Sequence, residues 1–279
     1  MNHKIKMIGL DLDGTLLTTE KIMTPYTRTV LEKALAEGIA VLVSTGRSIT
    51  AVPKDILSIP GMKYAVTSNG ARVLNIVTGE VLHESMISVE KAERILQILE
   101  KYDVIAEIFI DGVSYAGREV LKRAYEFFEN PNMAKYLIDT RVPVENVMEK
   151  LHEENMPVDK VHIIFCNLEE KKAAYEELKE ISGLVIASAY GNNLEVNKEG
   201  TDKGKGLLQL GKALGIAREE IMACGDGMND YEMLKAVGFA VAMENGHPNV
   251  KEIADYITES NDEDGVAKAI EKFALQRSI

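Results

Sequence analysis

Short apolar runs alternate with amphipathic stretches from the beginning of this chain of 279 residues. Residues 7–10, 39–43 and 64–67 are largely apolar, a pattern typical of parallel strands that are buried on both faces. Between the first two runs, Thr24 supplies an N-cap and Pro25 a first helical residue, which predicts a helix that ends before Gly38. Because strands and helices alternate, we predict an α/β protein with a mainly parallel, Rossmann-like sheet.

The pattern changes in the middle of the chain and then returns. The middle predicts a helix after Ser88, strands at 104–110 and 160–165, a helix at 169–180 and short strands at 184–189 and 194–196. Strand-loop-helix units resume after residue 200, with a helix at 202–214 and strands at 221–224 and 239–242. We therefore predict a core domain formed by residues 1–83 and 190–279, with residues 84–189 inserted as an α/β module and hinges near His83 and Tyr190.

Composition limits the possible partners. The chain carries 44 acidic and 32 basic side chains, a formal charge of −12, which disfavours nucleic acid and anionic membrane surfaces. No signal peptide and no apolar run of about 20 residues is apparent, so we expect a cytoplasmic protein, as a monomer or weak homodimer. The two cysteines, Cys166 and Cys224, exclude a disulfide framework, and we expect both to be buried.

Polar residues follow the predicted parallel strands at their carboxyl ends. The first strand leads into Asp-Leu-Asp-Gly-Thr at residues 11–15, and the second into Ser-Thr-Gly-Arg at 44–47. A later strand leads into Gly-Asp-Gly-Met-Asn-Asp at 225–230, while Lys203 lies at the start of the helix after the insertion. Ligands of open α/β sheets bind beyond the carboxyl ends of the strands, so we expect these loops to lie close together.

This set of side chains suits metal-assisted phosphoryl transfer. The carboxylates of Asp11, Asp226 and Asp230, with the backbone carbonyl of Asp13, form a hard oxygen site of the kind that Mg²⁺ prefers. Asp11 could attack phosphorus and form an aspartyl-phosphate, while Asp13 could protonate the leaving oxygen and then activate water. Thr45 and Lys203 would hold the phosphoryl oxygens.

At these motifs the chain resembles the haloacid dehalogenase superfamily, in particular Cof-type phosphatases of the YidA-like sugar phosphatase group. The four motifs occur in the family's order, and the insertion corresponds to the family's α/β cap of the C2 type. The resemblance implies that Asp11 is the nucleophile, that Asp13 is the general acid and base, and that Thr45 and Lys203 bind phosphate. It implies that Asp226 ligates Mg²⁺.

The remaining candidate residues surround this set. We include Leu12, Gly46, Arg47, Asn69 and Asn229 among the residues that bind substrate or phosphate, and Asp230 among the metal ligands. Arg47 could contact substrate or pair with a carboxylate of its loop, and Asn-Gly at 69–70 is also a turn signal. The acidic run at residues 262–264 is expected to be a solvated helix start, and His247 has a small chance of touching substrate.

The expected function is Mg²⁺-dependent hydrolysis of small phosphate monoesters, most of all sugar phosphates. One alternative is a phosphomutase or phosphotransferase that uses the same two aspartates. A second, from another class, is a non-catalytic phosphoacceptor or ligand sensor, although receiver-like domains lack a cap and the second aspartate. Dinucleotide and P-loop binding are disfavoured, since neither glycine pattern follows a predicted strand.

Overall fold

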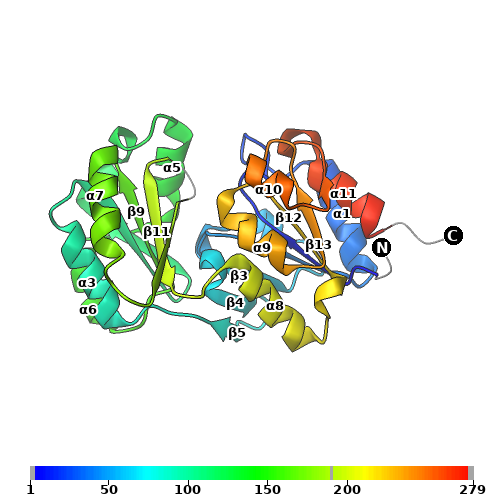
Figure 1. The fold of residues 1–279 in the computed structure, drawn as a ribbon, viewed down its shortest axis with the longest axis horizontal. Coiled ribbons are helices and arrows are strands. Elements are labelled where there is room, and N and C mark those ends of the chain that lie inside the picture. Colours follow the sequence, from blue (N-terminus) through cyan, green and yellow to red (C-terminus); the bar gives the residue numbers. More distant parts are fainter. Residues whose placement is uncertain (1–3, 189–190, 276–279) are drawn as a thin grey trace. The chain divides into compact units, whose positions relative to one another are not determined.

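The computed structural model describes residues 4–188 and 191–275 (Figure 1). The chain divides into two compact units. We call them the core unit (Met1–Gly46, Val52–Glu84 and Asp202–Ile279) and the inserted unit (Arg47–Ala51 and Ser85–Thr201). No helix among the described residues is both long enough and apolar enough to cross a membrane.

The core unit is built on an eight-stranded sheet in the order β14-β13-β12-β1-β2-β3-β4-β5. Neighbouring strands from β14 to β3 are parallel, while β4 and β5 continue the sheet as antiparallel strands. The predicted α/β fold with a mainly parallel sheet is thus confirmed. The strands are β1 (Met7–Leu10), β2 (Ala40–Ser44), β3 (Tyr64–Thr67), β4 (Arg72–Asn75), β5 (Val81–Glu84), β12 (Ile221–Gly225), β13 (Phe239–Ala242) and β14 (Tyr256–Ile257).

Helices enclose this sheet. Leu207 of α8 and Met233 of α9 pack with Met7, Leu42 and Val66 of the strands in one buried cluster. Helix α1 contacts β2 and α11. The helices are α1 (Pro25–Ala36), α2 (Lys54–Leu57), α8 (Lys203–Leu214), α9 (Tyr231–Ala236), α10 (Pro248–Glu252) and α11 (Gly265–Phe273). Shorter 3₁₀ turns are η2 (Ser68–Gly70), η4 (Arg218–Glu220), η5 (Met228–Asp230) and η6 (Asn261–Glu263).

The inserted unit has a six-stranded sheet in the order β10-β11-β9-β6-β7-β8, in which only β7 and β8 are parallel. Its strands are β6 (Val104–Ile110), β7 (Val113–Gly117), β8 (Val142–Val144), β9 (Lys160–Phe165), β10 (Leu184–Ala187) and β11 (Asn193–Lys198). Its helical segments are η1 (Ile49–Ala51), α3 (Val89–Leu99), α4 (Arg118–Lys122), η3 (Ala124–Glu126), α5 (Pro131–Thr140), α6 (Val147–Glu154) and α7 (Leu168–Leu178).

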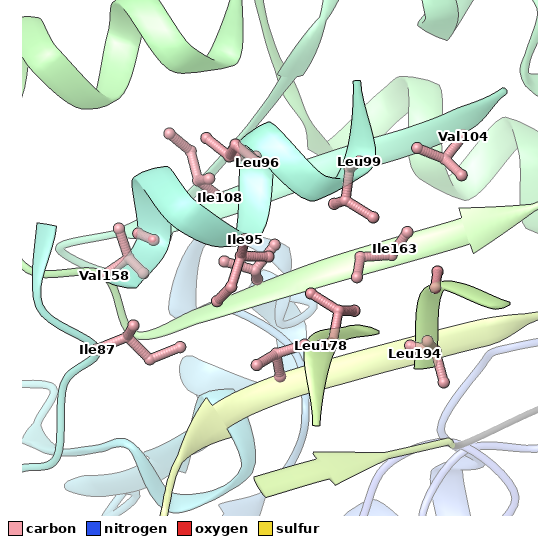
Figure 2. Close-up of a cluster of buried hydrophobic side chains, with 14 of the residues drawn as sticks. Ile87, Ile95, Leu96, Leu99, Val104, Ile108, Val158, Ile163, Leu178 and Leu194 are labelled. Atoms are coloured by element: carbon pink, nitrogen blue, oxygen red, sulfur yellow. The ribbon is translucent and has the colours of Figure 1, made fainter. Parts of the chain in front are cut away.

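Successive side chains point to opposite faces of this second sheet, and a hydrophobic cluster covers each face. On one face, Ile95 of α3 and Leu178 of α7 pack with Ile108 and Ile163 of the strands (Figure 2). The next residue along β9, Ile164, belongs instead to a smaller cluster with residues from α4, η3 and α5. The inserted unit therefore has a hydrophobic core of its own.

The division of the chain differs in part from the sequence-based boundaries. One division follows Glu84, whereas the other lies at Thr201 instead of residue 190. The reason is that β11 pairs with β9 and β10 and so completes the sheet of the inserted unit. Residues 189–190, where the predicted boundary and the Tyr190 hinge fall, lie outside the described residues. The short segment Arg47–Ala51 also groups with the inserted unit, which the sequence pattern did not indicate.

Candidate functional site

Four loops of the core unit meet at the carboxyl edge of its sheet. Asp11 follows β1, Thr45 follows β2, Asn69 lies in the turn after β3 and Asp226 follows β12. Strand β1 lies between β2 and β12, and all four strands run in the same direction. The parallel sheet therefore brings together residues that are up to 215 positions apart in the sequence.

Lys203 joins two carboxylates of this edge. It is the first residue of α8, whose N-cap Asp202 accepts a hydrogen bond from the backbone N–H of Lys205. Its Nζ lies 2.6 Å from Oδ1 of Asp11 and 2.6 Å from Oδ1 of Asp230, and the side chain of Lys203 is fully buried. A buried ammonium with two charged acceptors satisfies the rule that buried charges must be paired.

Gly70 sets the approach of this helix. Its φ is +93°, and an added Cβ would lie 2.1 Å from the carbonyl oxygen of Asp202. Only glycine permits both this left-handed backbone and this close approach. The Asn-Gly pair predicted as a turn therefore also fixes the start of the helix that carries Lys203.

Asp230 and Asp226 shape the loop after β12. Oδ2 of Asp230 accepts hydrogen bonds from the backbone N–H groups of Asp226 and Gly227, each at 3.0 Å. Oδ1 of Asp226 accepts a 2.8 Å hydrogen bond from the hydroxyl of Thr15. Asp230 thus uses one oxygen to hold the loop and the other to hold Lys203.

The cluster carries more negative than positive charge, which the pKa values reflect. Burial raises the pKa of Asp11 well above its ordinary range, and the nearby charge of Asp230 raises it further against the effect of Lys203. Burial, helped by Asp230, also raises the pKa of Asp226 to about 6. Burial alone would lower the pKa of Lys203, but the charges of Asp11 and Asp230 outweigh it and hold that pKa above the usual lysine value.

These carboxylates fit a hard divalent cation. Ligand oxygens of Asp11, Asp226 and Asp230 all lie within 4.8 Å of one another. Carboxylate oxygens are the ligands that Mg²⁺ takes in proteins, and a cation would offset both the burial and the mutual repulsion that raise the pKa values of Asp11 and Asp226. Asp13 was predicted to contribute its backbone carbonyl, and its side chain is not a member of this group.

Asp13 lies nearby but in a different environment. Its side chain is 40% exposed, and its carboxylate makes a 2.7 Å ion pair with Nζ of Lys21. Leu12 between the two aspartates is buried, and its carbonyl accepts hydrogen bonds from the backbone N–H groups of Thr15 and Leu17. Asp11, at the end of β1, is therefore part of the buried cluster, whereas Asp13, in the turn that follows, is in contact with solvent.

The remaining predicted residues divide between the two units. The backbone N–H of Asn69 donates to the carbonyl of Thr45 at 3.0 Å, so these two loops are joined, and Gly46 and Asn229 lie on the same edge. Arg47, in contrast, groups with the inserted unit, where its guanidinium lies 4.5 Å from the ring centre of Tyr136 and donates to the carbonyl of Ala51. His247 caps α10 through Nδ1.

One expectation about the cysteines was wrong. Cys166 is exposed because β9 ends at Phe165, whereas Cys224 within β12 is buried as expected. The acidic run at 262–264 precedes a helix as expected, with Asp262 and Glu263 exposed and Asp264 as the N-cap residue of α11; Asp262 and Asp264 also accept hydrogen bonds from Thr19 and Thr27. Lys21 and Thr15 were not predicted at all. Thr15 belongs to the first motif, but nothing in the sequence distinguishes Lys21 from other lysines.

Known proteins resemble this chain over nearly its full length. The chain matches the sequence model of haloacid dehalogenase-like hydrolases over residues 8–270. It is 33% identical over 283 residues to phosphatase YwpJ of Bacillus subtilis, covering 94% of this chain and 98% of that protein. It is 30% identical over 275 residues to the 5-amino-6-(5-phospho-D-ribitylamino)uracil phosphatase YcsE of the same organism, covering 97% and 96%.

Solved structures give the same result. A haloacid dehalogenase-like hydrolase from B. subtilis has a TM-score of 0.83 and 31% identity, covering 96% of this chain and 99% of that structure. The subclass IIB sugar phosphatase BT4131 has a TM-score of 0.81 and 27% identity, covering 97% and 100%.

Proposed function

Because this chain belongs to the haloacid dehalogenase-like hydrolase family, we propose that it is a phosphatase whose active site is the acidic edge of the core unit. The observation that carries this proposal is the buried ion-pair arrangement in which Lys203 lies 2.6 Å from both Asp11 and Asp230 at the end of β1. It supplies a carboxylate, a cation and oxygen ligands in one place, which phosphoryl transfer requires.

In the first step, a carboxylate oxygen of Asp11 attacks the phosphorus atom of a phosphate monoester. The bond from Asp11 oxygen to phosphorus forms, the ester bond from phosphorus to the alcohol oxygen breaks, and Asp13 gives a proton to the departing alcohol. Lys203 favours the ionised form of the attacking carboxylate and, with the hydroxyl of Thr45, neutralises charge on the phosphoryl oxygens. The product alcohol then leaves.

In the second step, Asp13 removes a proton from a water molecule, which attacks phosphorus. The bond between Asp11 and phosphorus breaks, inorganic phosphate is formed, and Asp11 returns to its starting state. The exposure of Asp13 suits this role, since a group that exchanges protons in each cycle needs access to water. Mg²⁺ held by Asp11, Asp226 and Asp230 would supply neutralisation of phosphate charge and orientation of the substrate.

For the substrate, we propose phosphate esters of alcohol groups carried by sugars or sugar-derived chains. The relative YcsE is named for a phosphorylated ribitylamino compound, and BT4131 is named a sugar phosphatase. Both names share a phosphate ester on a polyhydroxylated carbon chain. We propose that the inserted unit acts as a cap that selects among such compounds, as the sequence indicated.

The test is phosphate release from purified protein with a panel of sugar phosphates, nucleotides, phosphorylated vitamins and the ribitylamino compound, with Mg²⁺ and with a chelator. We expect metal-dependent release of inorganic phosphate from several sugar phosphates. Chromatography of the organic product separates hydrolysis from a phosphomutase reaction, which would return an isomeric sugar phosphate. Absence of phosphate release from every compound would overturn the proposal.

A further inference from the structure

Two asparagine side chains hold the loop that follows β1 at two points. Nδ2 of Asn245 donates to the carbonyl of Gly14 at 2.8 Å, and Nδ2 of Asn261 donates to the carbonyl of Leu17 at 2.9 Å. The two asparagines are themselves joined, since the backbone N–H of Asn261 donates to Oδ1 of Asn245 at 2.9 Å. They therefore form one connected unit, which we call the asparagine clamp.

The loop needs these partners because its internal hydrogen bonds do not involve the carbonyls of Gly14 and Leu17. The backbone N–H groups of Leu16 and Leu17 turn back to the carbonyls of Asp11 and Leu12, at 3.2 and 2.8 Å. The carbonyls of Gly14 and Leu17 accept instead from the asparagine clamp. Asp13 lies within the turn that these bonds close, and pairs with Leu17 as an isolated β-bridge. The position of the Asp13 carboxylate thus depends on where the two carbonyls are held.

The acidic run at residues 262–264 forms further hydrogen bonds with the segment that follows Leu17. Asp262 accepts from both the backbone N–H and the hydroxyl of Thr19, each at 2.7 Å. Asp264 accepts from the hydroxyl of Thr27 at 2.8 Å and from that of Thr24. Hydrogen bonds with residues 245–264 therefore hold the segment from Gly14 to Thr27, although the two segments are about 240 residues apart in the sequence.

We propose that Asn245 and Asn261 are positioning residues for the proton transfer by Asp13. The inference rests on the proposed phosphatase function, and it adds two residues that do not touch the reacting atoms. Removal of either amide frees one carbonyl and lets the turn that contains Asp13 shift. A displacement of about 1 Å at a reacting group can reduce the rate by about 100-fold.

The leaving group provides a specific readout. An alkyl phosphate, such as a sugar phosphate, releases a strongly basic alkoxide and needs a proton from Asp13. p-Nitrophenyl phosphate releases a weakly basic phenolate and needs this proton far less. Since kcat/KM covers the steps up to departure of the alcohol, a mispositioned Asp13 lowers kcat/KM for the alkyl ester more than for the aryl ester. A general loss of structure lowers both alike.

The experiment measures kcat/KM for both esters with wild type, Asn245→Ala and Asn261→Ala. We expect each variant to lose about 10-fold to 100-fold with the alkyl ester and about 3-fold or less with the aryl ester. Asn245 is exposed, so Asn245→Ala keeps the fold even if replacement of the buried Asn261 costs stability. Circular dichroism verifies folding of each protein.

Thr258→Val is the matched control. The buried hydroxyl of Thr258 donates to the carbonyl of Gly265 at 2.7 Å, so this variant loses a comparable hydrogen bond beside the same segment without touching the clamp. We expect the ratio of the two kcat/KM values to stay at the wild-type value. Equal losses with both esters in the asparagine variants, or no loss at all, would overturn the inference. If wild type hydrolyses neither ester, the proposed function fails and the inference falls with it.

Discussion

Nζ of Lys203 lies 2.6 Å from Oδ1 of Asp11, and this contact joins the first residue of α8 to the first residue after β1. Both side chains are buried, so neither charge is stable there without the other. The contact links the predicted nucleophile to the cation that would stabilise both its ionised form and the transferred phosphoryl group. Stability and catalysis therefore depend on the same pair.

Replacement of Lys203 by methionine tests this dependence. The change leaves the carboxylates of Asp11 and Asp230 without their buried cation, and loss of one partner of a buried pair costs about 3–5 kcal/mol. We expect the free energy of unfolding in chelator to fall by that amount and phosphatase turnover to fall by at least about 100-fold. Urea denaturation and phosphate release measure the two effects. A variant with wild-type turnover would contradict the assignment of Lys203.

Asp11 and Asp13 should respond differently to the same substitution. Asp11→Asn removes the nucleophile, so we expect no measurable turnover of any ester. Asp13→Asn keeps the nucleophile but removes proton transfer, and we expect turnover to fall by about 100-fold to 10,000-fold with the fold unchanged. Steady-state kinetics and circular dichroism of both variants provide the comparison. Substantial turnover in Asp11→Asn would eliminate it as the nucleophile.

Gly14→Ala should damage the site through a steric contact. Gly14 has φ +84°, and an added Cβ would lie 2.5 Å from Oδ2 of Asp226. The substitution combines left-handed backbone strain of about 1–2 kcal/mol with displacement of Asp226, the proposed metal ligand, so we expect turnover to fall by about 100-fold. Gly79→Ala is the matched control, because Gly79 has φ +76° and nothing within 4 Å of the added Cβ. We expect Gly79→Ala to be destabilised by the backbone strain alone and to keep wild-type turnover.

The raised pKa of Asp226 predicts how metal-free stability changes with pH. Its pKa is about 6 in the folded protein against 3.8 ordinarily, so the folded state holds this proton more tightly than the unfolded chain does. Stability should therefore be highest below about pH 4 for this group and fall by on the order of 2 kcal/mol as pH rises to 6. The pKa of Asp11 is also raised in the folded protein, so this carboxyl group likewise lowers stability as pH rises.

Thermal unfolding in chelator between pH 4 and 7 measures this effect. Asp226→Asn should flatten the profile, and Mg²⁺ should raise Tm more at pH 7 than at pH 5, because the cation binds the ionised carboxylates. A profile that is the same in wild type and Asp226→Asn would contradict the prediction.

A second buried charge group lies within the inserted unit. Glu107 accepts two hydrogen bonds from Arg141, at 2.9 and 3.0 Å, and lies 2.8 Å from Nδ1 of His162. Burial alone would raise the pKa of Glu107, but Arg141 and His162 lower it to about 2. This group therefore stabilises the unit above about pH 4.5, and the stabilisation is lost as pH falls toward 2. We expect Glu107→Gln to cost about 3–5 kcal/mol at pH 7 in urea denaturation.

Asp103→Asn provides the exposed counterpart to Glu107→Gln. Asp103 accepts a similar pair of hydrogen bonds from Arg123, at 3.0 and 2.7 Å, but both side chains are exposed. Because solvent screens an exposed ion pair, this variant should unfold at nearly the wild-type urea concentration. Equal losses in the two variants would contradict the role of burial.

Much of the core unit could be predicted because its signals are local. The run at 39–43 and the Thr24-Pro25 cap directly specify β2 and α1, and parallel strands place the residues after them on one edge. The loops with Asp11, Thr45 and Asp226 could thus be grouped without knowledge of any contact. Their family resemblance then suggested a role for each.

The features that were missed depend on distant partners. Asp262 is exposed as expected, but its hydrogen bonds with Thr19 were not predicted, because Thr19 is 243 residues earlier in the chain. The boundary after residue 189 was placed too early because β11 resembles any short strand, and only its pairing with β9 assigns it to the inserted unit. Helix α5 begins with an Asn130 N-cap and Pro131, a start signal from which no helix was predicted.

The position of β1 between β2 and β12 also has a consequence for synthesis of the chain on the ribosome. Met7 pairs with both Ala40 and Ile221, so the central strand waits for a neighbour that is made more than 200 residues later. The inserted unit, in contrast, draws nearly all of its residues from the continuous stretch Ser85–Thr201. Since domains fold as units during translation and distant pairings form slowly, we expect the inserted unit to fold first. The nascent core would then remain incomplete, and without activity, until β12 emerges.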